Sequence, residues 1–280
     1  MPRDAPSSSI AHSRPLTNIK AILFDTFGTL VDWEGSITRL LTEEAKKEQG
    51  GKAGELKKTD WLEFTRRWRK GYMVRTREIA SGKPGPGNID DLHLEILNGL
   101  LEDPSYSAVA SAWSSEKRRK ELCQLWHKLD AWPDVKPGLE ALRKLDPSIL
   151  LATLSNGTLR LLIDLAHHSS LTLDAHFSGD FLGSYKPNPK MYLGASSLLG
   201  FGSEEARVEK GEVAMCAAHI GDLRAAKEHG LRTIYLRRST EDVGVEGGGH
   251  AVKPASEGGE VDIVLEGEGE GLKELAGLLR

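Results

Sequence analysis

The sequence of 280 residues is poor in cysteine: it has only Cys123 and Cys216. Two cysteines are too few for a disulfide framework and lack the paired spacing of a metal site, which favours a reducing compartment. The sequence also lacks any run that approaches about 18 apolar residues, and its N-terminus has no apolar secretory region. We therefore expect a cytoplasmic protein with no membrane segment.

An excess of positive charge is also missing. The chain has 37 basic and 41 acidic residues, for a formal net charge of −4. Without a basic face for a phosphate backbone, we expect no nucleic-acid partner. The remaining composition, 39% apolar and 28% charged, is that of a globular chain. A chain of this length buries roughly three quarters of its unfolded surface.

Short, continuous apolar runs alternate with helical patterns along most of the chain. The predicted strands are residues 19–24, 148–155, 213–220, 231–237 and 261–265, and the predicted helices are residues 137–145, 159–168, 189–200, 222–230 and 271–280. Strands that alternate with helices of about ten residues indicate βαβ units. The sequence therefore predicts an α/β fold with a Rossmann-like, doubly wound parallel sheet.

One segment interrupts this alternation. Residues 34–133 contain helical patterns with aromatic residues at helical spacing and no convincing strand, which predicts an inserted helical domain. The core is then formed by residues 19–33 and 134–280. We expect residues 1–18, rich in serine and proline, to be a disordered N-terminal tail, and the glycine-rich residues 239–260 to be a mobile surface loop.

Polar side chains follow the predicted strands. Asp25 ends the first strand, Ser155 and Asn156 end the second, residues 219–222 end a later one, and Lys186 precedes a helix. In an open parallel sheet, ligands bind at the carboxyl ends of the strands. A helix cap or a turn explains each of these residues taken alone equally well. Their combination indicates a common site.

The segments FDTFGTLVDW (24–33), LSNGT (154–158), YKPNPKMY (185–192) and AAHIGDLRAAKEHG (217–230) carry a family resemblance. In their order and approximate spacing, the chain resembles the haloacid dehalogenase superfamily from about residue 19 to 237, and within it the type II 2-haloacid dehalogenases. The resemblance implies a helical cap inserted after the first strand. It also implies a hydrolase that cleaves the carbon–halogen bond of short 2-haloacids, a small-molecule substrate, and compatibility with a homodimer.

The resemblance further implies roles for individual residues. Asp25 matches the nucleophile, Lys186 the cation that neutralises it, and Asp222 the group that activates or orients the hydrolytic water. Ser155 and the backbone amides of Thr26 and Phe27 would bind the substrate carboxylate. Asn156 would donate to the departing halide, and the cap residue Arg69 would supply a cation for it. The implied substrate-binding set is Thr26, Phe27, Thr29, Arg69, Ser155, Asn156, Tyr192 and His219.

The chain departs from the superfamily's phosphatases at two positions. Phe27 stands where those enzymes carry the aspartate that protonates an alkoxide leaving group, and Ala218 stands where magnesium-dependent members carry a carboxylate. A halide leaves without a proton, and Mg²⁺ requires oxygen ligands. We therefore expect no metal and no cofactor.

His219 lies in the stretch where the type II pattern has serine and asparagine. It can be a hydrogen-bond donor, a base or a structural residue. A magnesium-dependent phosphatase or another hydrolase of the superfamily, and a catalytically silent binding protein, remain alternative functions. The other histidines show no metal-type spacing, and we expect them at the surface: His127, His167, His168, His176, His229 and His250.

Overall fold

The computed structural model describes residues 16, 18–49, 53–145, 149–203, 208, 211–267 and 270–279. The expected disordered tail, residues 1–18, lies outside these residues except for Leu16 and Asn18. The described chain forms one parallel sheet in the order β3-β2-β1-β4-β5-β6. Its strands are β1 (Ala21–Phe24), β2 (Leu150–Leu154), β3 (Ala175–Phe177), β4 (Val213–Ala217), β5 (Arg232–Arg237) and β6 (Ile263–Glu266). The predicted fold class is confirmed.

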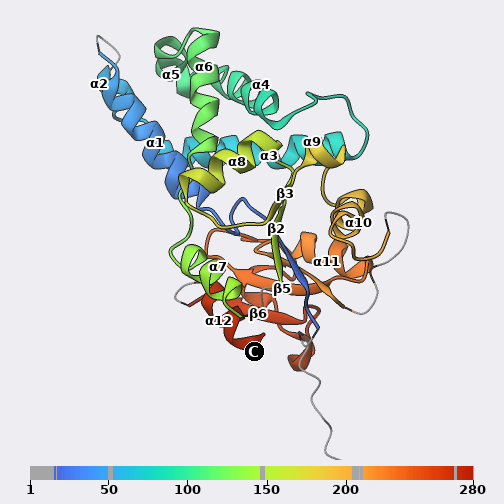
Figure 1. The fold of residues 1–280 in the computed structure, drawn as a ribbon. Coiled ribbons are helices and arrows are strands. Elements are labelled where there is room, and N and C mark those ends of the chain that lie inside the picture. The colour runs from blue at the N-terminus through green and yellow to red at the C-terminus, as the bar shows by residue number, and fades with distance from the viewer. Residues whose placement is uncertain are drawn as a thin grey trace, which may run out of the picture.

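Helices cover both faces of the sheet, which explains why β1 is a continuous apolar run. Ile22 and Phe24 face one apolar cluster, whereas Ala21 and Leu23 face the other. The first cluster includes helices α7 (Val135–Arg143), α8 (Leu159–His168) and α12 (Leu272–Leu278), and the second includes α10 (Pro189–Leu198) and α11 (Ile220–Glu228). Figure 1 shows α7 and α12 on one side of the sheet, and α10 and α11 on the other.

The segment between β1 and α7 contains helices joined by loops, with no named strand among its described residues. Its elements are α1 (Trp33–Lys47), α2 (Ala53–Leu56), α3 (Trp61–Ala80), α4 (Ile89–Leu101), η1 (Pro104–Tyr106), α5 (Ser107–Ala112), α6 (Glu116–Cys123) and η2 (Gln124–His127). They form the upper part of the molecule in Figure 1. The aromatic pattern predicted from the sequence becomes its core, where the rings of Phe64 and Trp68 lie edge to face, 6.1 Å apart.

The structure differs from the sequence expectations in two core segments. β3 was not predicted; it is only three residues long and lies at the edge of the sheet. Residues 239–260, expected to be a surface loop, contain η3 (Gly249–Ala251) and η4 (Ala255–Glu257) and bury Glu241 and Val252. Arg237 donates to the carbonyls of Gly249 and Val252, so the segment is packed against the end of β5. A last short helix, α9, spans Gly179–Leu182.

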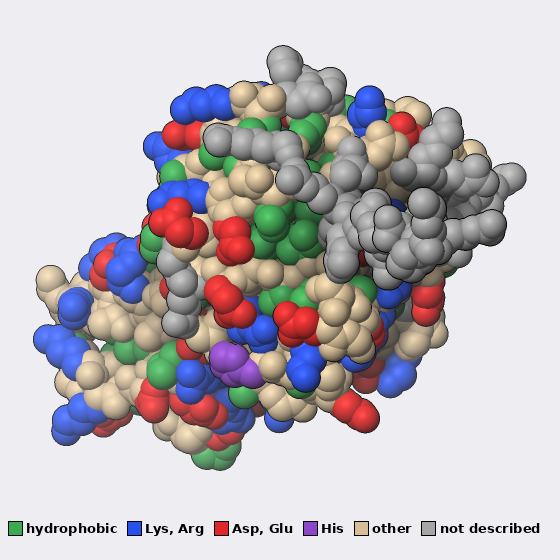
Figure 2. Space-filling model, turned by 90° about the horizontal axis from the view of Figure 1, so that it is seen from below, with side chains coloured by type: hydrophobic (Ala, Val, Ile, Leu, Met, Phe, Trp, Pro, Cys, Tyr) green, Lys and Arg blue, Asp and Glu red, His purple; other side chains and the backbone are tan. Residues whose placement is uncertain are grey.

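His127 is buried, so the expectation that it lies at the surface was wrong. Its ring nitrogens bond Asp164 of α8 at 2.9 Å and Asp90 of α4 at 3.1 Å. On the face shown in Figure 2, acidic and basic side chains are interspersed, and neither sign covers the surface. Among the described residues, no helix has the length and apolar character needed to cross a membrane.

Candidate active site

Asp25 lies directly after β1 and is buried, with 5% of its surface exposed. The chain turns sharply behind it: Leu30 and Val31 both donate to the carbonyl of Thr26. Gly28 has a φ of +81°, a conformation that glycine adopts without steric cost. The turn brings Thr29 back beside the carboxylate, and its hydroxyl donates to Asp25 Oδ2 over 2.7 Å.

The ammonium of Lys186 lies between two carboxylates. Its Nζ is 2.6 Å from Asp25 Oδ1 and 2.5 Å from Asp222 Oδ2, and Asp222 belongs to the first turn of α11. Burial favours the neutral form of Asp25, but the charges of Lys186 and His219 hold the pKa of Asp25 well below its usual value. Burial likewise opposes the charge of Lys186, yet the two carboxylates raise its pKa. The nucleophile candidate is therefore ionised.

Asn156 fixes the backbone of Lys186. The backbone N–H of Lys186 donates to Asn156 Oδ1 over 2.6 Å, and Asn156 Nδ2 donates to the carbonyl of Lys186 over 3.4 Å. The amide oxygen and one hydrogen of the amide nitrogen are thus engaged, and the expected role of Asn156 as a halide donor stays a prediction. The arrangement orients the lysine that pairs with Asp25.

His219 follows β4 and joins Asp25 to a second carboxylate. Its Nδ1 lies 3.1 Å from Asp25 Oδ2, and its Nε2 lies 2.8 Å from Glu241 Oε2. Burial lowers the pKa of His219, but the hydrogen bonds and charges of Asp25 and Glu241 outweigh burial and raise it well above 6.5. The imidazole is therefore a cation beside the ionised Asp25. Sequence reasoning did not identify Glu241.

Arg69 of α3 points into the protein. Its guanidinium carbon lies 5.7 Å from the ring centre of Phe27, 5.3 Å from Trp33 and 4.8 Å from Tyr72. The residue is 7% exposed and forms no ion pair with any residue that the structure describes. Burial raises the pKa of the Tyr72 hydroxyl. The charges of Arg69 and Lys186 lower this pKa, and the charge of Asp25 raises it. These charges therefore share one neighbourhood.

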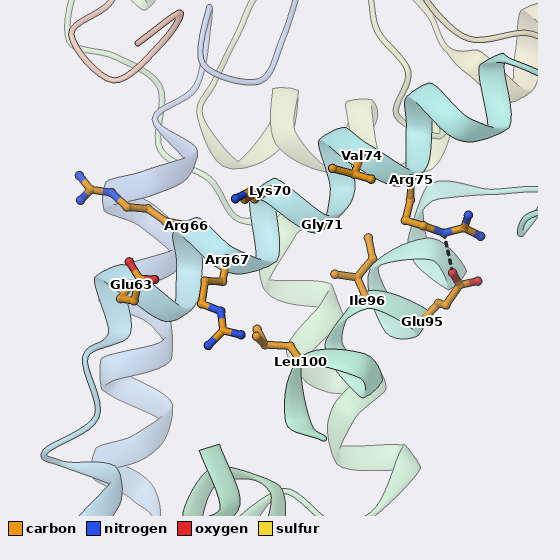
Figure 3. A pocket seen from close by; sticks show the side chains of 10 residues that line it. All are labelled: Glu63, Arg66, Arg67, Lys70, Gly71, Val74, Arg75, Glu95, Ile96 and Leu100. Carbon is orange, nitrogen blue, oxygen red and sulfur yellow. Dashed lines mark hydrogen bonds and ion pairs between the residues drawn. The ribbon is translucent and has the colours of Figure 1, made fainter. Parts of the chain in front are cut away.

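The neighbouring basic residues of α3 face elsewhere. Arg66, Arg67 and Lys70 line a hollow of about 730 Å³ between α3 and α4, which Figure 3 shows from close by. None of the residues that line this hollow belongs to the Asp25 cluster. α3 therefore carries Arg69 on its buried face and the other three basic residues on its exposed face.

The remaining predicted residues are buried around the same strand ends. Ser155 Oγ accepts from the backbone N–H of Gly157 over 3.2 Å. The hydroxyls of Thr26 and Tyr192 have no hydrogen-bond partner within the described part of the chain. The ring of Tyr192, in α10, stacks on His229 at 6.0 Å and belongs to the second apolar cluster. Burial and the charges of Asp222 and Asp25 raise the pKa of its hydroxyl, so this core ring is also a neighbour of the site.

Asp25, His219 and Asp222 are close enough together to suggest a metal site, with ligand atoms within 4.8 Å of one another. Two observations do not fit magnesium. The Lys186 ammonium already contacts both carboxylates, so a divalent cation would meet a like charge there. Mg²⁺ also prefers an all-oxygen octahedron, whereas one of the three side chains is an imidazole.

This geometry agrees with comparisons with known proteins. A family model described as haloacid dehalogenase-like hydrolase matches residues 19–230. The chain belongs to the haloacid dehalogenase-like hydrolases. Its relatives include (S)-2-haloacid dehalogenase 4A of Burkholderia cepacia, 25% identical over 79% of this chain and 84% of that protein. The (S)-2-haloacid dehalogenase of Xanthobacter autotrophicus is 26% identical over 80% and 77% of the two chains.

A solved structure gives the same family. The crystal structure of the defluorinating L-2-haloacid dehalogenase Rha0230 is 32% identical, covers 94% of this chain and 95% of that one, and superposes with a TM-score of 0.74. In this haloacid dehalogenase-like hydrolase, the sequence analysis did not identify three residues that the structure places around the site: Glu241, Trp33 and Tyr72. Only the position of Glu241, shortly after β5 at the carboxyl edge of the sheet, offered a signal.

Proposed function

We propose that this hydrolase cleaves the carbon–halogen bond of short 2-haloacids and releases the 2-hydroxy acid, through an ester on Asp25. One observation carries the proposal: a buried, ionised aspartate shares its site with a buried arginine that has no carboxylate partner among the described residues. The (S)-2-haloacid dehalogenase relatives support the same substrate class.

In the first step, an oxygen of Asp25 attacks C2 of the substrate from the side opposite the halogen. The new C–O bond forms as the C–X bond breaks, and the electron pair leaves with the halide, so the configuration at C2 inverts. Arg69 binds the departing anion in a desolvated environment of aromatic rings, where its charge acts strongly. The halide needs no proton, which suits the apolar Phe27.

The substrate carboxylate binds to Ser155 and to the backbone amides of Thr26 and Phe27, opposite Lys186. Lys186 also holds Asp25 in place, and Thr29 restrains the other oxygen of that carboxylate. Asn156 positions Lys186 through its backbone, and Tyr192 closes the wall of the site. A cytoplasmic location and a homodimer remain predictions from the sequence.

In the second step, water attacks the ester at Cγ of Asp25, so the solvent oxygen enters the aspartate. A single turnover in H₂¹⁸O is therefore expected to place ¹⁸O in Asp25, which mass spectrometry of the peptide containing Asp25 detects. Halide release from 2-chloropropionate should not depend on added Mg²⁺. Asp25→Asn should release no halide, whereas the exposed control Asp91→Asn should match the native protein.

Other results would contradict the proposal. Label found only in the hydroxy acid would mean that water attacks the substrate directly. Hydrolysis of an aryl phosphate that rises with Mg²⁺, without halide release, would favour the phosphatase alternative. Ligand binding with neither halide nor phosphate released would favour the binding protein.

A further inference from the structure

The imidazole of His219 is held between two carboxylates of different environment. Nδ1 faces Asp25, whose charge disappears when the proposed ester forms, and Nε2 faces Glu241, whose charge remains. The His219 side chain is 18% exposed, so water can reach it, whereas that of Glu241 is 6% exposed. The negative charge of Asp25 is therefore absent while the ester exists, whereas the negative charge of Glu241 is present throughout the reaction.

Glu241 is fixed by contacts from both parts of the molecule. Its Oε1 accepts from Trp33 Nε1 over 2.6 Å, at the start of the helical segment, and from Thr240 Oγ1 over 3.0 Å. A Cβ at Gly28 would lie 2.4 Å from Cδ of Glu241, so the glycine leaves the space that the carboxylate fills. With Oε1 occupied, Oε2 remains directed at His219.

Ester formation changes the electrostatics of His219. Before attack, Asp25 and Glu241 outweigh the effect of burial and keep the pKa of the imidazole high. Alkylation removes the charge of Asp25, so one of the two charges that offset burial is lost and the pKa of His219 falls. The imidazole then loses its proton to solvent, and Nδ1 faces the ester. The other charged groups around this position are Asp222 of α11, Asp242 after β5, Lys186 before α10 and Arg69 of α3.

The carboxylate of Asp222 is already engaged by a cation. Its Oδ2 contacts Lys186 Nζ at 2.5 Å. When Asp25 becomes a neutral ester, the buried ammonium keeps Asp222 as its remaining carboxylate partner among the described residues. Asp222 Oδ2 is thus occupied by the ammonium, whereas Nδ1 of His219 faces Asp25 directly.

We propose that His219, oriented by Glu241, is the general base that activates water for hydrolysis of the Asp25 ester, in place of Asp222. The inference rests on the proposed function. Neutral His219 takes a proton from water as the oxygen bonds to Cγ. The tetrahedral intermediate then expels the hydroxy acid oxygen, which receives that proton. The regenerated Asp25 carboxyl gives its proton to His219, which restores the initial ion pair. Glu241 is a positioning residue.

The decisive measurement is the mass of the intact protein after mixing with 2-chloropropionate. His219→Gln should release a burst of about one halide per chain and then carry the added mass of the ester on Asp25. Ester hydrolysis should slow by about 10²-fold or more, the usual contribution of a general base. Asp222→Asn should not accumulate the ester. The exposed control His250→Asn should match the native protein.

A second variant tests the orienting carboxylate. Glu241→Gln keeps the shape of the side chain and removes its charge, so the pKa of His219 should fall. The acidic limb of the profile of kcat against pH reports the base and should move to lower pH, and kcat should fall by about tenfold while the burst of halide remains. Glu257→Gln, on the exposed η4, is the matched control. Loss of a merely structural contact would lower stability without moving the pH limb.

Several outcomes would overturn the inference. An ester that accumulates in Asp222→Asn, and not in His219→Gln, would make Asp222 the base. A folded His219→Gln variant that forms no ester would place His219 in the first step instead. If Asp25 of the native protein is never alkylated and no halide appears, the proposed function itself fails and the inference fails with it.

Discussion

The charged side chain of Arg69 is buried, which lowers the stability of the folded protein. Burying an ion without a partner costs several kcal/mol, and contacts with aromatic rings return about 0.5–2 kcal/mol. The free protein therefore tolerates this arginine at a net cost to stability. Such a cost is typical of residues retained for function, because an anionic ligand supplies the missing charge.

This reasoning predicts opposite effects of Arg69→Met on activity and stability. Halide release should fall by about 10²-fold or more in kcat/KM, the usual effect of removing a charge-stabilising donor. The melting temperature should hold or rise, because the unpaired charge is gone while the aromatic packing remains. Arg66→Met, on the exposed face, is the control. A lowered melting temperature with unchanged kcat/KM would make Arg69 a structural residue.

At the scale of the element, the sequence predicted the parts whose signals are local. The other five strands and the helix at residues 159–168 followed from apolar runs and periodicity. Asp25 followed from its place at the end of the first strand, and Lys186 from a motif just before a helix. β3 was missed because two half-buried residues and one buried residue at the edge of the sheet leave almost no pattern. Glu241 was missed because its role depends on His219 and Trp33, which are distant in the chain.

A buried ion pair joins several of these elements behind the site. Arg238, just after β5, contacts Asp134 at 2.7 Å, with side chains 2% and 1% exposed. Asp134 precedes α7 and also accepts from the backbone N–H of Leu272 at the start of α12. Arg238 in turn donates to the carbonyl of Thr29, in the turn that follows Asp25. Removal of Arg238 would leave the buried carboxylate of Asp134 without a compensating charge.

We therefore expect Arg238→Met to lower the free energy of unfolding by about 3–5 kcal/mol, measured by urea denaturation. The double variant Arg238→Met with Asp134→Asn should recover a large part of this loss, because the buried charge is removed while the residue still accepts from Leu272. Arg224→Met, in an exposed pair with Glu260, should change stability by no more than about 1 kcal/mol. Additive losses in the double variant would contradict the pairing.

At the scale of the whole molecule, His127 connects the helical segment to the core. It belongs to η2 and bonds Asp90 of α4 on one side and Asp164 of α8 on the other. Burial lowers its pKa, but the two carboxylates outweigh burial and raise the pKa above 6.5. The cation is thus stabilised in the folded protein relative to the unfolded chain.

The sign of the pH dependence follows from this raised pKa. The stabilisation by His127 is fully present below the unfolded pKa of about 6.5 and is lost as pH rises through the folded value. After allowance for solvent screening, the bridge contributes about 1 kcal/mol, or about 2–4 °C in melting temperature. The melting temperature of His127→Asn should therefore be lower than that of the native protein at pH 6. This difference in melting temperature should disappear at alkaline pH. The exposed His250→Asn should show no such difference at either pH. A difference at pH 6 that persists unchanged at alkaline pH would mean that His127 contributes packing and not charge.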